Sequence, residues 1–235
     1  MIQIALETTG KTGSLAILDG QHTLWKCRLG IQRRTAAELA IQLEAALAWC
    51  GAHASRPDWI SVAVGPGSFT GLRIGITTAK TLGYALELPI VPVGSLMAIA
   101  AASALSEDVS SVLVGLNAYR HQVFAAEISR EELHDHPALA ASNHRVEVLQ
   151  RSEWDRRVLV ATETDNQAVT GDRSIFSDQG LEQFAERPEP DAVGVGRIAA
   201  RLVQGGRPDA VFTDPFSLAA RYLKPSAAEE QAALR

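Results

Sequence analysis

The sequence contains few cysteines, and their arrangement is not typical of a metal site or a disulfide framework. Cys27 and Cys50 are the two cysteines among 235 residues, and they form no C-x-x-C pair. A zinc knuckle or a network of disulfides is therefore not indicated. Two unpaired cysteines suit a reducing compartment, and we predict a cytoplasmic protein.

Clusters of basic residues are also missing. The chain has 22 Lys and Arg against 27 Asp and Glu, which gives a formal net charge of -5. No window gathers the roughly five or six basic residues that mark a protein gripping a nucleic-acid backbone on its own. If RNA is involved, we expect a partner protein to bind it and this chain to contact RNA only as part of the complex.

The chain shows neither a secretory leader nor a clear membrane span. Its start, Met1–Leu6, lacks the basic beginning and the small-residue cleavage site of a signal peptide. Residues 88–106 are uncharged and almost long enough to cross a bilayer, but Pro89, Pro92 and Gly94 interrupt their start. We expect a strand, a turn and a buried helix there, and no membrane association.

Common catalytic and metal motifs are absent too. The six histidines form neither H-x-x-x-H nor H-E-x-x-H, and the closest pair, His134 and His136, lies in a polar run typical of a solvated loop. The glycine-rich segment 65–71 matches none of G-x-x-x-x-G-K-[ST], G-x-G-x-x-G and G-x-S-x-G. We predict no metal site and no catalytic residue.

Hydrophobic periodicity and turn signals predict an α/β fold in which a similar order of elements occurs twice. Gly51 is the predicted C-terminal cap of the first helix, Ser68 or Thr70 is the predicted N-terminal cap of the second, and Asp19-Gly20 is a predicted hairpin turn. The predicted strands are 2–7, 14–18, 23–29, 59–64, 89–93, 111–116, 123–128, 145–149 and 157–161, and the predicted helices are 35–50, 70–86, 95–105, 179–186 and 191–203. Hairpins followed by crossover helices imply mixed sheets flanked by helices. We divide the chain into lobes at 1–108 and 109–235, with the last helix packing back on the first lobe.

Two turns are candidate nucleotide contacts. The loop at 65–71 leads into a helix, whose first backbone N–H groups can bind an anion. Glu7 ends the first strand, where strand ends in such folds face ligand crevices. Each turn also has a purely structural interpretation. The loop at 65–71 would be an ordinary strand-to-helix turn, and Glu7 would be an exposed carboxylate at a strand end. We favour the structural interpretation for both. The candidate nucleotide-binding residues are Glu7, Thr8, Thr9, Gly65, Gly67 and Ser68.

Small residues form a stripe along the helix at 70–86. Gly71, Gly75, Ala79 and Gly83 recur four residues apart and so share one narrow side. Each glycine inside a helix costs about 1 kcal/mol relative to alanine, and close backbone contact with a neighbour would offset that cost. The neighbour is either the chain's own sheet or a helix of another subunit.

The helix at 35–50 is apolar on nearly every side, whereas a sheet covers only one side of a helix. A second covering surface is therefore needed, either inside this chain or on a partner. Two such helices side by side could form half of an intersubunit four-helix bundle. The predicted interface residues are Ala36, Ala37, Ala40, Ile41, Ala45, Gly71, Leu72, Gly75, Thr78, Ala79 and Leu82.

The most distinctive segment is Ala63–Lys80, with the sequence A-V-G-P-G-S-F-T-G-L-R-I-G-I-T-T-A-K. Together with Leu6–Thr9 and Pro89–Leu96, it resembles the TsaB family, also called YeaZ. Asn117–Arg120 is similar to the Asp-Ala-Arg segment of the family, and Arg221–Pro225 to its C-terminal Tyr-Leu-Arg. The resemblance covers most of the chain, and it is weakest between residues 130 and 187.

The resemblance implies the duplicated fold of actin, sugar kinases and heat-shock chaperones (ASKHA), and a role in forming threonylcarbamoyladenosine at position 37 of transfer RNA. The family member is a non-catalytic paralogue of the transferase TsaD, which it binds through the helices equivalent to 35–50 and 70–86. The ATPase TsaE joins this pair. Without its partner, the chain is expected to form a homodimer through the same helices.

Differences from the family change which metals, cofactors and nucleotides we expect the chain to bind. The transferase carries a metal-binding H-x-x-x-H after the strand equivalent to 90–93, but here the sequence is Gly94–Ala98, G-S-L-M-A. Glu7 and Asn117 each replace an Asp of the family, and Arg33–Thr35 stands near its His-Ser. We expect no tightly bound cofactor and at most weak binding of ATP or ADP. The alternative function is a stand-alone ATP-dependent phosphotransferase or ATPase, and a glycoprotease-like metallopeptidase is less favoured.

Overall fold

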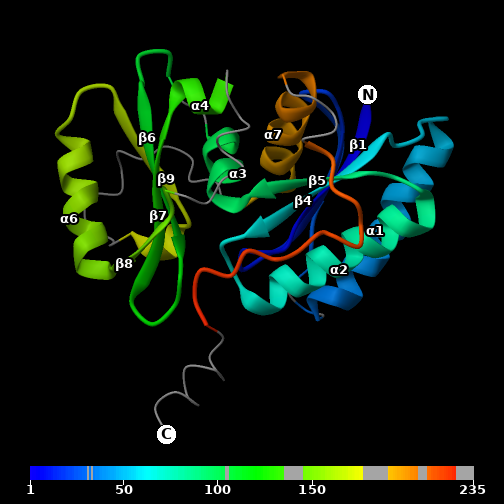
Figure 1. Ribbon diagram of the computed structural model, residues 1–235, viewed down its shortest axis with the longest axis horizontal. Helices are drawn as coiled ribbons and strands as arrows, with labels where there is room; N and C mark the ends of the chain where they lie inside the picture. Colours follow the sequence, from blue (N-terminus) through cyan, green and yellow to red (C-terminus); the bar gives the residue numbers. More distant parts are fainter. Residues whose placement is uncertain are drawn as a thin grey trace, which may run out of the picture.

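The computed structural model describes residues 1–30, 32, 34–103, 106–134, 145–176, 190–205 and 211–225. Its elements form two mixed sheets, with helices between them and on their outer faces (Figure 1). None of the helices in these ranges is both long and apolar enough to cross a membrane.

The first sheet has five strands in the order β3-β2-β1-β4-β5. Its central strand, β1, pairs antiparallel with β2 and parallel with β4. Gly20, in the turn between β2 and β3, has a φ of +55°, which agrees with the hairpin signal in the sequence. The strands are β1 (Ile2–Glu7), β2 (Ser14–Asp19), β3 (His22–Arg28), β4 (Trp59–Gly65) and β5 (Ile90–Gly94).

The second sheet repeats this plan with four strands in the order β8-β7-β6-β9. Its strand β6 pairs antiparallel with β7 and parallel with β9, as β1 does with β2 and β4. The strands are β6 (Ser111–Asn117), β7 (Gln122–Ser129), β8 (Glu147–Gln150) and β9 (Gln167–Gly171). The predicted α/β fold with a repeated order of mixed-sheet elements is confirmed.

The helices and sheets stack in layers, which can be followed across Figure 1. Helices α1 and α2 cover one face of the first sheet, α3 and α7 lie between the sheets, and α6 covers the outer face of the second sheet. The helices are α1 (Thr35–Ala52), α2 (Phe69–Leu86), α3 (Ser95–Ala102), α4 (Arg130–His134), α6 (Arg151–Thr162) and α7 (Ala192–Gly205), with a short 3₁₀ turn, η2, at Arg173–Ile175.

The largest core lies between the two sheets, because alternate residues of their strands face each other across α3 and α7. Leu18 and Trp59 of the first sheet belong to the same cluster as Val112 and Phe124 of the second. Although α7 follows the second sheet in the chain, it packs on β1, β2 and β4 of the first. The Gln3 amide in β1 donates to the carbonyl of Gly196 in α7 at 2.8 Å. The two lobes therefore share one interior.

Two details of the predicted secondary structure are wrong. Residues 157–161 belong to α6 and not to a strand, because Trp154, Val158 and Ala161 recur at helical spacing and pack on the second sheet. The strand that pairs in parallel with β6 is β9, which the sequence patterns did not reveal.

The end of the first helix also differs from expectation. Gly51 does not cap it, since the helix continues through Ala52 and the first left-handed residue is Ala54, with a φ of +49°. The uncharged stretch after residue 88 folds as β5 and α3, as predicted. The helix expected at 179–186 lies outside the described residues.

Candidate functional site

The outer side of α1 is exposed and almost uncharged. Of its exposed residues, Glu44 alone is charged, and Ile41 is 42% exposed. The helix contributes Leu39, Ala46 and Cys50 to the core, so the sheet covers one side of it and no other described element covers the opposite side. We call this surface the α1 face; its exposed apolar residues are Ala36, Ala37, Ala40, Ile41, Ala45, Ala48 and Ala52.

The small-residue stripe of α2 faces the chain's own sheet. A Cβ atom added to Gly71 would lie 1.8 Å from the carbonyl oxygen of Thr8, and one added to Gly75 would lie 2.3 Å from the Thr8 hydroxyl oxygen. Ala79 is fully buried, and Gly83 lies against β5. The close approach that the glycines allow is therefore internal.

This burial corrects part of the predicted interface. Gly71, Leu72, Gly75, Ala79 and Leu82 are buried inside the chain, so in this conformation they offer a partner almost no surface. The remaining predicted residues are accessible, with Thr78 half-buried and the five α1 residues exposed. For those six residues, a role in partner binding stays a prediction.

Glu7 lies at the end of β1 and is completely buried, which contradicts the favoured alternative of an exposed carboxylate. The backbone N–H of Thr9 donates to Glu7 Oε1 at 2.6 Å, and the Thr9 hydroxyl donates to the same oxygen. The other oxygen, Oε2, has no hydrogen-bond partner among the described residues. Burial raises the pKa of Glu7 from 4.5 to about 7, and the Thr9 hydrogen bonds limit the rise.

The six candidate nucleotide-binding residues come together, and the side-chain and backbone hydrogen bonds of Thr8, Thr9 and Ser68 are made within this group and to α2. The backbone N–H of Ser68 donates to the carbonyl of Thr9 at 2.9 Å, and the hydroxyl of Thr8 donates to the carbonyl of Gly71 at 2.7 Å. Of the two predicted caps, Ser68 and not Thr70 caps α2, because the Ser68 hydroxyl accepts from Gly71 N at 3.2 Å. Thr9 also fills the space beside Gly67, where an added Cβ would lie 2.5 Å from the Thr9 Cβ.

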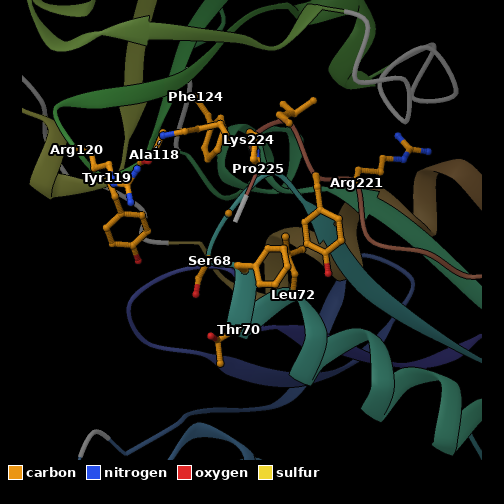
Figure 2. Close-up of a pocket in the computed structure, with 14 residues that line it drawn as sticks. Ser68, Thr70, Leu72, Ala118, Tyr119, Arg120, Phe124, Arg221, Lys224 and Pro225 are labelled. Atoms are coloured by element: carbon orange, nitrogen blue, oxygen red, sulfur yellow. Dashed lines mark hydrogen bonds between the residues drawn. The ribbon is translucent and has the colours of Figure 1, made fainter. Parts of the chain in front are cut away.

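A pocket of about 310 Å³ opens beside this junction, between the two lobes (Figure 2). It is formed by the start of α2, the turn between β6 and β7, and the C-terminal segment 221–225. We call it the interlobe pocket; its lining residues are Gly67, Ser68, Phe69, Thr70, Leu72, Ala118, Tyr119, Arg120, Phe124, Arg221, Tyr222, Leu223, Lys224 and Pro225. Among these described residues four are aromatic, three are basic and none is acidic.

The C-terminal segment is tied to both lobes. In the first lobe, the backbone N–H of Arg221 donates to the carbonyl of Val64 at 2.8 Å, and the Lys80 ammonium donates to the carbonyl of Leu218 at 3.0 Å. In the second lobe, the Lys224 ammonium donates to the Ala118 carbonyl and to Gln122 Oε1, at 3.1 and 2.6 Å. The wall of the pocket is therefore held in place from two sides.

The sequence analysis did not assign the pocket residues Tyr119, Arg120 and Lys224 to a site. A signal was present, because the segments 117–120 and 221–225 both carried the family resemblance. Local patterns do not show that segments about a hundred residues apart along the chain meet in space, so the pocket emerges from the fold.

The structure also locates the segment where the resemblance would place a metal-binding H-x-x-x-H. Gly94–Ala98 joins β5 to α3, and the side chains of Ser95 and Met97 are buried. In the described part of the chain, no three His, Cys, Asp or Glu residues lie close enough together to hold a metal ion. His136 falls outside that part.

The repeated mixed sheets, the shared helical middle layer and the pocket between the lobes give the chain an ASKHA-type fold. Two solved structures share this fold along nearly their whole length, described as YeaZ from Pseudomonas aeruginosa and as an uncharacterized protein with similarity to peptidase YEAZ from that organism. Their TM-scores are 0.65 and 0.66 at 20% and 19% identity, and the match covers 94% and 95% of this chain and 99% of each of theirs.

Sequence comparison identifies the family. The profile of the TsaD family, described as tRNA N6-adenosine threonylcarbamoyltransferase, matches residues 31–151, just over half of the chain. The chain belongs to this family and, within it, to the TsaB (YeaZ) group.

Curated relatives carry the name tRNA threonylcarbamoyladenosine biosynthesis protein TsaB. The protein from Haemophilus influenzae is 28% identical over 130 residues, 55% of each chain, and that from Bacillus subtilis is 33% identical over 101 residues, 43% of this chain and 44% of the relative. The Escherichia coli protein is 41% identical over 68 residues, 29% of each chain. The matched segments thus span about half or less of these relatives.

Proposed function

We propose that this chain is a non-catalytic scaffold and activator subunit for threonylcarbamoyladenosine formation in transfer RNA. In this role it binds and activates a TsaD-type transferase and helps to recruit a TsaE-type ATPase. The TsaB group of relatives supports the pathway, and the observation that carries the scaffold role is the exposed α1 face.

The α1 face has the composition of a protein interface rather than of a solvated helix. A helix on a protein surface normally directs charged and polar residues outward, but α1 exposes seven apolar residues and one charged residue among its outer positions. A continuous exposed apolar patch of this kind marks a binding surface. Alanine side chains are short, so the axis of a partner helix can approach closely.

Activation follows if the partner binds this face more tightly in its competent conformation than in its other conformations. A ligand shifts a conformational equilibrium only by its difference in affinity for the two states. Helices α1 and α2 lie side by side on the first sheet, so they offer half of a four-helix bundle and a firm template for the partner's own helices (Figure 1). We propose that this template, rather than a chemical group, is what the chain supplies.

The residues after β5 support an accessory role. Where the resemblance predicts two metal-binding imidazoles in the catalytic relative, this chain has apolar and hydroxyl side chains packed at the start of α3. An imidazole pair could hold and orient a metal ion, and these side chains are poor ligands for it.

The decisive experiment compares two exposed apolar residues on opposite sides of the molecule. Ile41→Glu places a charge on the α1 face, and Leu159→Glu places the same charge on α6, where the wild-type residue is 60% exposed. We expect Ile41→Glu to weaken association with the transferase at least about tenfold, measured by sedimentation, and to slow modification of transfer RNA by the reconstituted system. Both variants should keep the wild-type melting temperature.

The control fixes how the result is interpreted. Leu159→Glu should bind and support modification like the unsubstituted chain. Equal binding by Ile41→Glu and the unsubstituted chain would refute the α1 face as the interface, and equal losses in both variants would point to a general effect of the added charge. Turnover of ATP by the purified chain alone in the presence of magnesium, with micromolar affinity for ATP, would instead support an independent ATP-dependent enzyme.

A further inference from the structure

We propose that a groove at the C-terminal end of α2 receives an arginine side chain from the partner protein that covers the α1 face. The groove has a volume of about 640 Å³, and it is formed by the end of α2, the turn into β5 and the segment 212–216. We call it the α2-end groove. The proposal rests on the scaffold role, and it adds to that role a second contact with a defined chemistry.

The first line of evidence is a pair of exposed aromatic rings in the groove. Tyr84 is 69% exposed and Phe216 is 75% exposed, more than any other large apolar side chain in the described part of the chain. Their ring centroids lie 5.7 Å apart, at an interplanar angle of 77°. Single exposed apolar residues are common on protein surfaces, but two aromatic rings in edge-to-face contact form a platform that a partner can cover.

The exposed ring of Phe216 is carried by a backbone that is held at several points. The backbone N–H of Thr213 donates to the carbonyl of Ile90 at the edge of β5, at 2.7 Å. Asp214 Oδ1 accepts from the Phe216 N–H at 2.8 Å, and the Lys80 ammonium donates to the Phe216 carbonyl at 3.4 Å. The turn that presents the ring is therefore formed in advance, so binding does not have to order it.

The second line of evidence is charge. Two exposed carboxylates, Glu87 and Asp214, line the groove, and its described lining contains no lysine, arginine or histidine. Aromatic faces attract positive charge, and carboxylates form charge-assisted hydrogen bonds with it. Arginine suits this combination best, because its planar guanidinium can stack on a ring and pair with a carboxylate at the same time.

Glu87 also stands where the helix itself disfavours it. It is the C-terminal cap of α2, with φ of +53° and ψ of +45°, a left-handed conformation that residues other than glycine rarely adopt. Its carboxylate lies at the negative end of the helix dipole, and the last turn of α2 contains no basic residue. A cation bound beside Glu87 would offset this unfavourable electrostatic position.

The groove adjoins the surface that we assign to the partner. A second hollow, of about 360 Å³, lies between the C-terminal ends of α1 and α2, which run next to each other in Figure 1, and its lining includes Leu47 and Leu86. Leu88 lines both this hollow and the α2-end groove. A partner seated on α1 can therefore reach the groove across a continuous surface.

An NMR titration of the isotopically labelled full chain tests the chemistry without the partner. The probe is N-acetyl-arginine amide, and we expect saturable shifts in the backbone signals of residues 84–88 and 212–216, with an affinity that falls as salt is raised. N-acetyl-citrulline amide is the matched control, since it has a similar shape without the charge, and it should cause much smaller shifts. An absence of shifts in these two segments, or equal shifts with both compounds, would overturn the proposal.

Glu87→Lys tests the contact in the complex with the transferase. We expect sedimentation to show association weakened roughly tenfold, because an attractive charge pair becomes a repulsive one. The variant should melt no lower than the unsubstituted chain, since a lysine is favoured at the C-terminal end of a helix, so unfolding would not explain the loss. Glu107→Lys makes the same change at an exposed glutamate before β6, outside the groove, and it should associate normally.

Tyr84→Ala tests the aromatic platform in the same way. It should weaken association roughly two- to fivefold, because it removes one ring face from the guanidinium. Tyr119→Ala, at an exposed tyrosine between β6 and β7, is its matched control and should associate normally. Unchanged association of both Glu87→Lys and Tyr84→Ala would overturn the proposal, and so would self-association of the chain that Glu87→Lys abolishes, because the occupant would then be a second copy.

The outcomes separate this proposal from the scaffold role. Ile41→Glu should still show the shifts caused by N-acetyl-arginine amide. If Ile41→Glu leaves association unchanged while Glu87→Lys weakens it, the α1 face fails as the interface and the groove stands. If Ile41→Glu weakens association while Glu87→Lys does not, the groove proposal fails and the α1 face stands.

Discussion

The two halves of the molecule share a strand plan but differ in their outer helical layers. The α1 face in the first half is a row of alanines and Ile41 with one charged residue, whereas α6 in the second half carries charged pairs. The Nε atom of Arg151 lies 3.0 Å from Oδ1 of Asp155, and the Nη2 atom of Arg156 lies 2.6 Å from Oε1 of Glu153. The strand order that the two halves share therefore does not predict which half binds a partner. The composition of the outer helical surface predicts it.

The presence of exposed apolar residues does not by itself distinguish the outer surface of α1 from that of α6. Leu159 and Val160 are exposed on α6, but Asp155 and Arg156 lie one helical turn before them, so charge interrupts the apolar surface. On α1, the residues four positions from Ile41 are Ala37 and Ala45, and those three positions away are Glu38, which is half-buried, and Glu44, which is exposed. The two layers therefore differ in the number of exposed charges, with Glu44 the one exposed charge on α1 and both Asp155 and Arg156 exposed on α6.

The inner sides of the two layers differ as well. Helix α2 approaches the first sheet through glycines that touch Thr8, while α6 packs on the second sheet with the fully buried ring of Trp154. The indole N–H of Trp154 donates to the carbonyl of Ile175 at 3.1 Å. The first half thus depends on close backbone contact, and the second half on one large side chain.

The largest expected effect is that of Gly71→Ala. The added methyl group would overlap the backbone carbonyl of Thr8, which cannot move without shifting β1, so we expect a loss of about 3 kcal/mol in the free energy of unfolding. Gly51→Ala is the matched control on the exposed end of α1, where an added Cβ meets nothing within 4 Å, and it should stabilise by about 0.5–1 kcal/mol. Urea denaturation measures both. Similar stability of the two variants would show that α2 does not touch the sheet as described.

The next effect concerns the buried carboxyl group beneath α2. The pKa of Glu7 is raised from 4.5 to about 7, so the folded state holds the proton more tightly than the unfolded state does between these values. The contribution to stability is complete below about pH 4.5 and is lost as the pH rises through 7, a loss of about 3 kcal/mol. Glu7→Gln should remove this dependence and be more stable than the unsubstituted chain at pH 8.

Urea denaturation at pH 5 and pH 8 checks this expectation, with Glu44→Gln on the exposed side of α1 as the control. Glu44→Gln should follow the pH profile of the unsubstituted chain. If Glu7→Gln showed the same pH profile as the unsubstituted chain, the carboxyl group of Glu7 would not be buried in solution.

The smallest effect is expected on α6. Hydrogen bonds from Arg156 and Arg157 lower the pKa of Glu153 from 4.5 to about 2, the opposite direction to Glu7. The stabilising contribution is present above about pH 4.5 and is lost as the pH falls through 2. Because this carboxylate is exposed, Glu153→Gln should change the stability at pH 7 very little. A carboxyl titration by NMR measures the pKa directly, and a value near 4.5 would mean that the pairs do not form in solution.

Much of the fold could be predicted because its signals are local. The Ser68 cap, the turn at Gly20 and the hydrophobic periodicities of β1, β4 and α2 each act within a few residues. The strand β9 escaped prediction because its segment, Q-A-V-T-G, is short and only partly apolar, and its pairing with β6 decides its structure.

The site was harder to predict than the fold. A stripe of small residues indicates close contact but not with which surface, so the glycines of α2 were also assigned to a partner when they face Thr8. Likewise, the position of Glu7 at a strand end did not reveal that the neighbouring layers bury it completely. Burial is a property of the assembled layers rather than of a sequence window.

The attachment of the C-terminal segment to both lobes has a mechanical consequence. Rotation of one lobe away from the other would have to break the Lys224 hydrogen bonds to the β6–β7 turn, or pull the segment away from Lys80 and Val64. The segment thus acts as a brace against hinge opening. A chain truncated after residue 210 would lose that brace together with one wall of the interlobe pocket, and its two lobes would be freer to move as separate bodies.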